Sequence, residues 1–325
     1  MLHTRFTELL GIQYPIMSAP MALHSSGPLA AAVSKAGGLG SFGGINPGGG
    51  NWVREQIRHV RAETDRPFGV GFITHYIPML PQCFEAAVDE HAPVIAFSFV
   101  DPKPWITQAK ESGATTICQV QSMAGAREAV DAGADVLVAQ GNEAGGHTGT
   151  MNLLPFLARV IDAFPDVPVL ASGGISSGRA LAAVLAAGAE GAWLGTALLA
   201  TTEATDVSDA HKQRIVASDG EDTIYTQVFD IVDGSSWPNG IAGRVHNNTF
   251  AQEWQGRERE LRAKREELAP AYTAAYERRD PDTMALYFGT GAGSVSAIRP
   301  AADVITSICT EAEQLLRERS ERLLR

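Results

Sequence analysis

The first two hundred residues repeat one pattern, in which a short apolar run is followed by a turn and an Ala-rich helical stretch. Strands that alternate with helices pair in parallel through right-handed crossovers. The predicted strands are residues 15–19, 38–43, 67–73, 93–97, 115–120, 135–140, 168–171 and 191–194. The predicted helices between them are residues 27–35, 52–63, 82–90, 104–112, 123–132, 153–163 and 177–187. Eight such strands favour an α/β fold of the closed (β/α)8 or TIM barrel type over an open doubly wound sheet.

Glycines support this arrangement of strands and helices. Gly37, Gly113, Gly133 and Gly188 each come just after a predicted helix. Glycine ends helices there because it adopts the left-handed backbone conformation at little cost. Residues 167–171 read Val-Pro-Val-Leu-Ala and are apolar on both faces, which is typical of a parallel strand covered by helices on both sides.

The pattern stops after Thr196, and residues 204–298 contain no further alternation. We expect a polar loop at 230–248 and a charged helix at 252–268 in that segment. Residues 300–324 are amphipathic and fit the eighth barrel helix. We therefore expect a barrel made of residues 1–203 and 299–325. A smaller, mainly helical substrate or lid domain of residues 204–298 would be inserted over the C-terminal mouth, where barrels carry their active sites.

Composition excludes several classes of protein. Apolar residues make up 45% of the chain, and the net charge of −11 argues against nucleic-acid or anionic-membrane partners. Cys83, Cys118 and Cys309 form neither a disulfide framework nor a metal-binding pattern, so we expect no metal site. No apolar run reaches the ~18 residues of a membrane span, and the N-terminus lacks a signal-peptide core. We expect a cytoplasmic protein with a small-molecule substrate, and a homodimer stays open.

One glycine motif is misleading. Residues 38–43 read Gly-Leu-Gly-Ser-Phe-Gly and fit GxGxxG. A dinucleotide-binding motif follows a strand and opens a helix. Here the glycines follow a predicted helix and form the strand itself, so we do not predict a Rossmann site.

Two other glycine sites end neighbouring strands. Gly173 and Gly174 follow the strand at 168–171, and Gly195 and Thr196 follow the strand at 191–194. The loops after the last two strands of many barrels bind phosphate through backbone N–H groups and a helix N-terminus. Thr196 adds a hydroxyl donor. The alternative is that these are ordinary tight turns, but two such sites together favour binding of one phosphate monoester.

The loop at 140–149 contains His147, which differs from the other seven histidines because it follows a barrel strand and lies among glycines. We expect its side chain to lie at the barrel mouth. Histidine titrates near neutral pH, so it can act as a general base or a proton donor. No second His, Cys or carboxylate joins it in a metal pattern, and we expect the nearby Glu143 to face solvent.

Several segments resemble one known family. They are Pro-Ile-Met-Ser-Ala-Pro-Met at 15–21, the Gly-Asn-Glu-Ala-Gly-Gly-His-Thr-Gly loop at 141–149, Ala-Ser-Gly-Gly-Ile at 171–175, Leu-Gly-Thr at 194–196 and Gly-Thr-Gly-Ala-Gly at 289–293. These resemble the nitronate monooxygenases, formerly called 2-nitropropane dioxygenases. FMN-dependent enoyl-ACP reductases and NADH:quinone reductases are close relatives. The resemblance covers most of the chain and implies an FMN-binding barrel with a smaller substrate domain.

The resemblance also implies roles for individual residues. The flavin phosphate would lie on the glycines and threonine after the last two strands. The catalytic residue of the family matches His147. The remaining expected flavin contacts are Ala19, Pro20 and Met21 against the ring, with Gln119, Gln140, Gly145 and Gly146 as hydrogen-bonding positions.

Two positions depart from the family pattern. Family members often carry Asn where this chain has Gly71, which leaves only the backbone of Gly71 to contact the cofactor. Many carry Gln where this chain has Trp193. Both changes are expected to alter the contacts to the flavin ring.

The resemblance implies an FMN-dependent monooxygenase that oxidises alkyl nitronates with O2 to carbonyl compounds and nitrite. His147 would accept the α-proton of a neutral nitroalkane or hold the nitronate. One alternative is an NAD(P)H-dependent FMN reductase of an enoyl thioester or a quinone on the same scaffold. Another is a non-catalytic flavin- or phosphate-binding barrel. Candidate lid aromatics, with core packing as their alternative role, are Phe229, Trp237, Phe250 and Tyr287.

Overall fold

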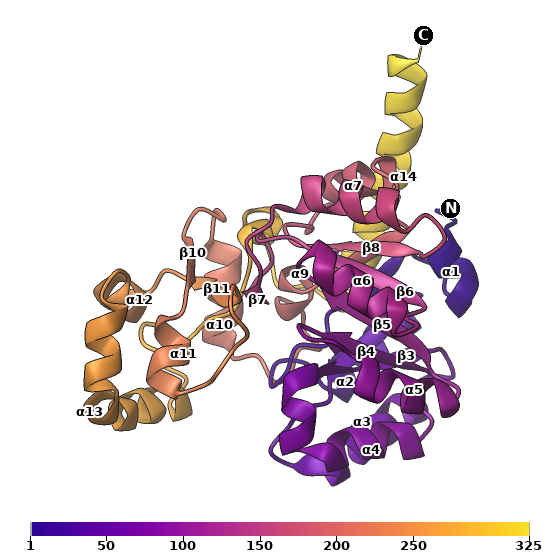
Figure 1. Cartoon of the computed structure of the whole chain (residues 1–325). Coiled ribbons are helices and arrows are strands. Elements are labelled where there is room, and N and C mark those ends of the chain that lie inside the picture. The colour runs from indigo at the N-terminus through magenta and orange to yellow at the C-terminus, as the bar shows by residue number, and fades with distance from the viewer. Residues whose placement is uncertain (1, 325) are drawn as a thin grey trace.

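The computed structural model describes residues 2–324 and contains a barrel of eight parallel strands (Figure 1). In sheet order they are β1 (Ile16–Ser18), β9 (Gly191–Leu194), β8 (Val169–Ser172), β6 (Val136–Gln140), β5 (Thr115–Val120), β4 (Val94–Ser98), β3 (Phe68–Ile73) and β2 (Gly40–Gly43). A parallel bridge between Met17 and Leu39 joins the two ends of this order. The Ser18 N–H donates to the Leu39 carbonyl at 3.0 Å, which closes the barrel. The predicted (β/α)8 barrel is confirmed.

Side chains along the strands alternate between the barrel interior and the layer of helices, as the period of a strand requires. One cluster fills the interior and includes Met17, Leu39, Ile117, Leu170 and Trp193. The helix α1 (Arg5–Leu10) adds Phe6 to this cluster. The strand residues between these positions pack outward in a second, larger cluster with the surrounding helices.

Eight helices surround the strands. They are α2 (Gly27–Lys35), α3 (Gly49–Glu63), α4 (Pro81–Asp89), α5 (Lys103–Glu111), α6 (Met123–Asp131), α7 (Leu153–Ala163), α8 (Gly178–Ala186) and α14 (Ala301–Leu323). The last of them, α14, packs against α8 and α2, as predicted for the eighth barrel helix. Backbone φ angles of 90° to 98° at Gly37, Gly113, Gly133 and Gly188 confirm the left-handed helix ends. No helix within residues 2–324 is both long and apolar enough to cross a membrane.

We define the lid as residues 204–298, the segment that lies beside the barrel in orange in Figure 1. A short helix, α9 (Thr196–Leu199), follows β9, and a 3-10 turn, η1 (Thr74–Met79), follows β3. The lid contains α10 (Asp209–Ala217), β10 (Thr223–Thr226), α11 (Val228–Asp233), β11 (Ala242–His246), α12 (Thr249–Trp254), α13 (Glu258–Glu277) and η2 (Thr290–Ser294). It is mainly helical and has a core of its own around Val228, Phe250 and Trp254.

Two predictions about the lid are wrong. The segment 230–248 is not a polar loop, because it contains most of α11 and all of β11. The charged helix predicted at 252–268 is two helices, α12 and α13, separated at Gly256, whose φ of +80° breaks the helix.

A small antiparallel sheet joins the lid to the barrel. Its strand order is β10-β11-β7, and β7 (Gly146–Thr148) comes from the loop that follows barrel strand β6. His147 pairs with Gly243 in this sheet. A loop of the barrel is therefore also a strand of the lid's sheet, and the sequence did not indicate this pairing.

Candidate active site

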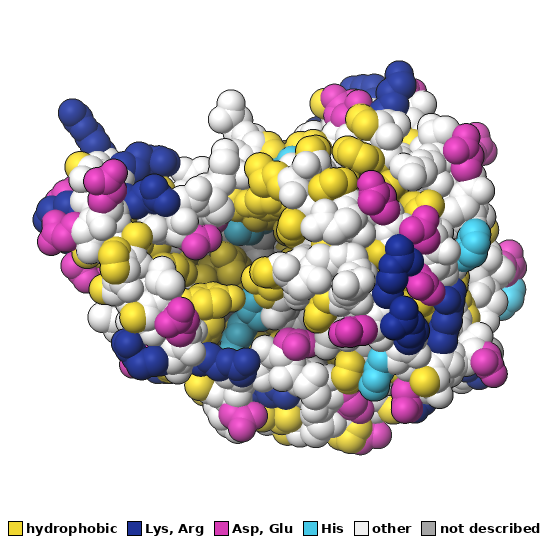
Figure 2. All heavy atoms as spheres, turned by 90° about the horizontal axis from the view of Figure 1, so that it is seen from below, with side chains coloured by type: hydrophobic (Ala, Val, Ile, Leu, Met, Phe, Trp, Pro, Cys, Tyr) yellow, Lys and Arg dark blue, Asp and Glu magenta, His cyan; other side chains and the backbone are white. Residues whose placement is uncertain are grey.

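A cavity of about 470 Å³ lies between the C-terminal ends of the barrel strands and the lid. Figure 2 shows the molecule hollowed at this place, with hydrophobic and histidine side chains inside the hollow. The volume lies within the range of small-molecule binding sites. The barrel contributes residues at or just after the C-terminal ends of β1, β3, β4, β5, β6, β8 and β9, and the lid contributes mostly aromatic side chains.

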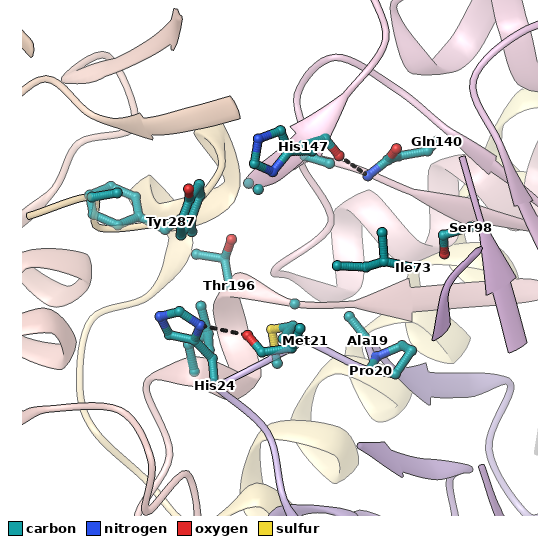
Figure 3. A pocket seen from close by; sticks show the side chains of 18 of the residues that line it. Ala19, Pro20, Met21, His24, Ile73, Ser98, Gln140, His147, Thr196 and Tyr287 are labelled. Carbon is teal, nitrogen blue, oxygen red and sulfur yellow. Dashed lines mark hydrogen bonds between the residues drawn. The ribbon is translucent and has the colours of Figure 1, made fainter. Parts of the chain in front are cut away.

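Thirteen of the fourteen residues predicted for the site line this one cavity. In Figure 3, Ala19, Pro20 and Met21 form one wall, and Gln140 and His147 lie on the opposite side. The predicted residues that line the cavity are Ala19, Pro20, Met21, Gln119, Gln140, Gly145, Gly146, His147, Gly173, Gly174, Trp193, Gly195 and Thr196.

Gly71 is the exception, and the expectation that its backbone contacts the cofactor needs correction. Gly71 does not line the cavity. A Cβ atom at this position would lie 2.1 Å from Pro20 Cγ, so the proline ring occupies the space that a side chain would fill. The Gly71 carbonyl accepts a hydrogen bond from the Gly44 N–H at 2.7 Å. Pro20 therefore covers Gly71 on this side.

The backbone after β8 and β9 leaves N–H donors free at one end of the cavity. Gly173 and Gly174 have φ angles of +117° and +68°, which a side chain would disfavour. Within residues 2–324, the N–H groups of Gly173, Gly174 and Gly195 have no acceptor. Thr196 Oγ1 accepts from the Gly289 N–H at 3.0 Å, so its own hydroxyl proton is free to donate. Such a group of donors suits the oxygens of a phosphate.

The helix N-terminus at this end of the cavity is that of α9, which begins at Thr196, and not that of α8. The Gly178 N–H donates to Glu311 Oε2 of α14 at 2.8 Å. The Ala180 N–H donates to Ser177 Oγ at 3.2 Å. Because these side chains already cap the helix, the amides of Gly178 and Ala180 are not available to a ligand.

His147 is held by two residues of the lid. Its Nε2 lies 2.8 Å from Asp230 Oδ1 of α11, and the two side chains are only 9% and 11% exposed. Its ring stacks on the Trp237 indole with 3.5 Å between centroids and 11° between planes. Sequence reasoning missed Asp230 because it lies far along the chain in a segment predicted to be a loop.

A row of glutamines holds the backbone of His147 from the barrel side. Gln140 Nε2 donates to the His147 carbonyl at 3.1 Å, which Figure 3 marks with a dashed line. Gln121 Nε2 donates to Gln140 Oε1 at 2.8 Å and lies 3.4 Å from Gln119 Oε1. Both groups of the Gln140 amide are therefore used inside the protein, whereas Gln119 Nε2 has no partner among the described residues. The role of Gln121 was missed, although it follows Gln119 at the spacing of two that places both on one face of a strand.

Glu143 does not face solvent as expected. Its two carboxylate oxygens accept from the Leu153 N–H at 3.1 and 3.0 Å and cap α7. Arg244 of β11 donates from Nε to the Asn142 carbonyl at 2.6 Å. The loop that carries His147 is therefore fixed by contacts to both the barrel and the lid.

Aromatic side chains of the lid cover the cavity. Phe229, Trp237 and Tyr287 line it as proposed, whereas Phe250 packs in the core of the lid. Tyr272 and Tyr276 also line the cavity and were missed, although their spacing of four places them on one face of a helix.

The Tyr287 hydroxyl is a hydrogen-bond donor in this wall. Burial, together with the nearby Asp230 carboxylate, holds the pKa of Tyr287 well above its ordinary range. The hydroxyl therefore remains protonated at neutral pH. In Figure 3, Tyr287 lies between His147 and His24 on the lid side of the cavity.

Comparison with known proteins gives a consistent picture. The family model described as "Nitronate monooxygenase" matches residues 3–82 and 80–311. The chain is 31% identical to a nitronate monooxygenase of Neurospora crassa, over 93% of this chain and 90% of that one. It is 34% identical to a (3aS,4S,5R,7aS)-5-hydroxy-7a-methyl-1-oxo-octahydro-1H-indene-4-carboxyl-CoA dehydrogenase of Mycobacterium tuberculosis, over 70% of this chain. The chain spans only 64% of the length of that dehydrogenase.

Solved structures match over nearly the whole chain. FabK from Thermotoga maritima has a TM-score of 0.88 and 32% identity, over 99% of this chain and 100% of that one. Nitroalkane oxidase from Streptomyces ansochromogenes has a TM-score of 0.81 and 30% identity, over 96% of this chain and 99% of that one. These similarities extend through the barrel and the lid.

Proposed function

Because the chain belongs to the nitronate monooxygenase family, a family of FMN-dependent oxidoreductases, we propose that it oxidises alkyl nitronates with O2 to carbonyl compounds and nitrite. The observation that carries this proposal is the position of His147. It lies in the wall of the large cavity, paired with a buried carboxylate, while free backbone donors lie elsewhere in the same cavity. This arrangement supports a proton-transfer residue beside a bound phosphate-bearing cofactor. The proposed partners are therefore small molecules.

FMN fits the residues present. Its phosphate would be held by the free amides of Gly173, Gly174 and Gly195 and by the Thr196 hydroxyl. The strap of residues 19–21 would lie against the ring, and Gln119 would use its free amide nitrogen toward it. Gln140 would act indirectly, through the backbone of His147. When bound, FMN supplies the electron transfer, which protein side chains do not provide.

The chain's own residues would bind the substrate and move its proton. With Nε2–H donated to Asp230, His147 keeps the lone pair of Nδ1 to accept the α-proton of a neutral nitroalkane. With a preformed nitronate, no such transfer is needed, and the Tyr287 hydroxyl would donate a hydrogen bond to its oxygens. His147 would do so only in its doubly protonated form, in which Nδ1 also carries a proton. The aromatic side chains of the lid would hold the alkyl group and exclude water.

A second candidate is an NAD(P)H-dependent reductase of an enoyl thioester or a quinone. The observation that favours it is the similarity to a CoA-thioester dehydrogenase and to FabK. In that case His147 would give a proton to the substrate instead of taking one. The barrel and the cofactor site are equally compatible with both reactions.

Anaerobic stopped-flow measurement of the flavin absorbance separates these functions. The FMN-loaded protein is mixed in turn with NADH, NADPH and an alkyl nitronate. Flavin reduction by the nitronate alone is the expected result. Fast reduction by NADH or NADPH would favour the reductase, and a protein inert to all three would point to a non-catalytic flavin-binding barrel.

A further inference from the structure

We propose that Asp230 positions the His147 imidazole and that proton transfer in the cavity therefore requires the lid in the position seen here. The inference rests on the proposed function in so far as His147 is the group that moves the substrate proton. It extends that function by naming the residue that orients His147 and by placing that residue on the lid.

The surroundings of Asp230 assign the proton on His147. Among the described residues, no lysine or arginine forms an ion pair with Asp230. Its Oδ1 is 2.8 Å from His147 Nε2 and 3.3 Å from Ser235 Oγ. A buried carboxylate is stable only with hydrogen-bond donors around it, so Nε2 carries a proton that it donates to Asp230. Nδ1 has no hydrogen-bond partner within residues 2–324, so it is the ring nitrogen that can exchange a proton with the substrate.

Two different parts of the molecule control the position of His147. The barrel holds its backbone through Gln140, which binds the carbonyl and is itself held by Gln121, and the lid adds the pairing of β7 with β11. The lid fixes the rotation of its ring, because Asp230 takes Nε2–H and Trp237 covers one face of the ring. A displaced lid would break the pairing of β7 with β11 and would leave His147 held by the barrel through Gln140, with a ring that is free to turn.

Other titratable groups around His147 do not substitute for Asp230. Asp233 lines the cavity one helical turn further along α11 but makes no hydrogen bond to His147. His75 of η1 approaches from the barrel side, and burial, with the neighbouring His147 as a smaller cause, lowers its pKa. The ring centroids of Tyr287 and His147 are 5.7 Å apart, and no hydrogen bond joins the two side chains among the described residues. Asp230 is the carboxylate in contact with the imidazole.

The first test is NMR spectroscopy of holoprotein labelled with ¹⁵N-histidine, and it needs no substrate. The His147 resonances are assigned by their loss in His147→Asn. We expect the wild type to show a downfield Nε2 proton of His147 that is protected from exchange, as in a hydrogen bond to a carboxylate. This signal should be lost in Asp230→Asn and retained in Asp230→Glu.

A matched control is available in the lid. Asp222 Oδ2 lies 3.4 Å from His246 Nε2 in a partly exposed His–Asp contact of the lid, outside the cavity. Asp222→Asn should leave the His147 signal unchanged. If the signal persists in Asp230→Asn, or is lost equally in Asp222→Asn, the proposed pairing is wrong.

The second test is kinetic. Asp230→Asn should lower kcat for a neutral nitroalkane by at least about 10- to 100-fold, the loss typical when the carboxylate partner of a metal-ligating histidine is removed. KM, flavin content and turnover of a preformed nitronate should change little, and Asp230→Glu should recover much of kcat. Equal losses in Asp230→Asn and Asp222→Asn would overturn the proposal. If the wild type turns over neither substrate, the proposed function fails, while the NMR comparison still decides whether Asp230 holds His147.

Discussion

Pro20 lies so close to Gly71 that a Cβ atom at residue 71 would be 2.1 Å from Pro20 Cγ and 2.4 Å from Pro20 Cβ. The strap of residues 19–21, which lines the cavity, rests on β3 at a place that has no side chain. The absence of a side chain at residue 71 therefore decides where this wall of the cavity lies. A larger residue at 71 is compatible with the barrel only if the strap moves.

The first prediction follows from this contact. Gly71→Ala should displace Pro20, lower the free energy of unfolding by about 1–3 kcal/mol and weaken FMN binding, because the core is already filled there. Thermal unfolding and fluorescence titration of the apoprotein with FMN measure the two effects. Gly69→Ala, on the same strand, is the control, because its Cβ would meet its neighbours at ordinary distances of 3.4 and 3.5 Å. Equal behaviour of the two variants would mean that the strap does not depend on Gly71.

The second prediction concerns the proposed phosphate site. Gly174→Val should sharply reduce FMN occupancy, because the φ of +68° strains a side chain and its Cβ would lie 3.3 Å from Glu143 Cβ, which would shift the turn that carries the free amides. Gly188→Val is the control. Gly188 follows α8 away from the cavity, has a φ of +98°, and a Cβ atom there would lie 3.5 Å from Ile161. Both variants should lose stability, but only Gly174→Val should lose FMN, as measured on released cofactor. Unchanged FMN affinity in Gly174→Val would move the phosphate site elsewhere.

The barrel was predictable because its signals are local. Each strand is an apolar run of a few residues, and each helix end carries its own glycine, so every unit is visible within a short stretch of sequence. The cavity residues followed from the same pattern. Parallel strands bring their C-terminal ends to one mouth, so Gly173, Gly195 and His147 were expected to meet there before any contact was known.

The sheet of the lid was not predictable, because its pairing is made between segments that are distant in the chain. β11 contains Arg244 and His246 and shows no clear alternation of apolar and polar residues. One of its pairing partners is β7, which comes from a barrel loop. Asp230 was missed for the same reason, because its contact with His147 forms only when the lid packs on the barrel. The expected cofactor contact of Gly71 was wrong for another reason. Neither the sequence around Pro20 nor that of the strand containing Gly71 indicates that the proline ring packs on the glycine.

The third prediction concerns stability in acid. Burial, with the neighbouring His24 as a smaller cause, lowers the pKa of His211 to about 3. An unfolded histidine titrates near ~6.5, so between these two values the unfolded state binds more protons than the folded state. The contribution of His211 to stability is therefore fully present above pH ~6.5 and is lost as the pH falls toward 3, at up to ~1.4 kcal/mol per pH unit.

Urea unfolding at neutral and mildly acidic pH tests this prediction. His211→Gln should be less stable than the wild type at neutral pH, but it should lose less stability on acidification, because glutamine does not titrate. His59→Gln, at an exposed histidine, is the matched control for the substitution itself. A pH dependence in His211→Gln as steep as in the wild type would show that the acid sensitivity comes from other groups.

The last prediction separates proton transfer from the later steps. General-base catalysis is typically worth roughly 10²–10⁴-fold, so His147→Asn should lose about that factor in kcat/KM for a neutral nitroalkane. It should lose much less with the preformed nitronate, whose α-proton is already gone. FMN content should stay near that of the wild type, because the free amides at Gly173, Gly174 and Gly195 do not involve the His147 side chain. Equal losses on both substrates would mean that His147 holds the anion instead of removing the proton. Full activity on both, with FMN bound, would show that His147 has no catalytic role and that its contact with Asp230 serves only to join the lid to the barrel.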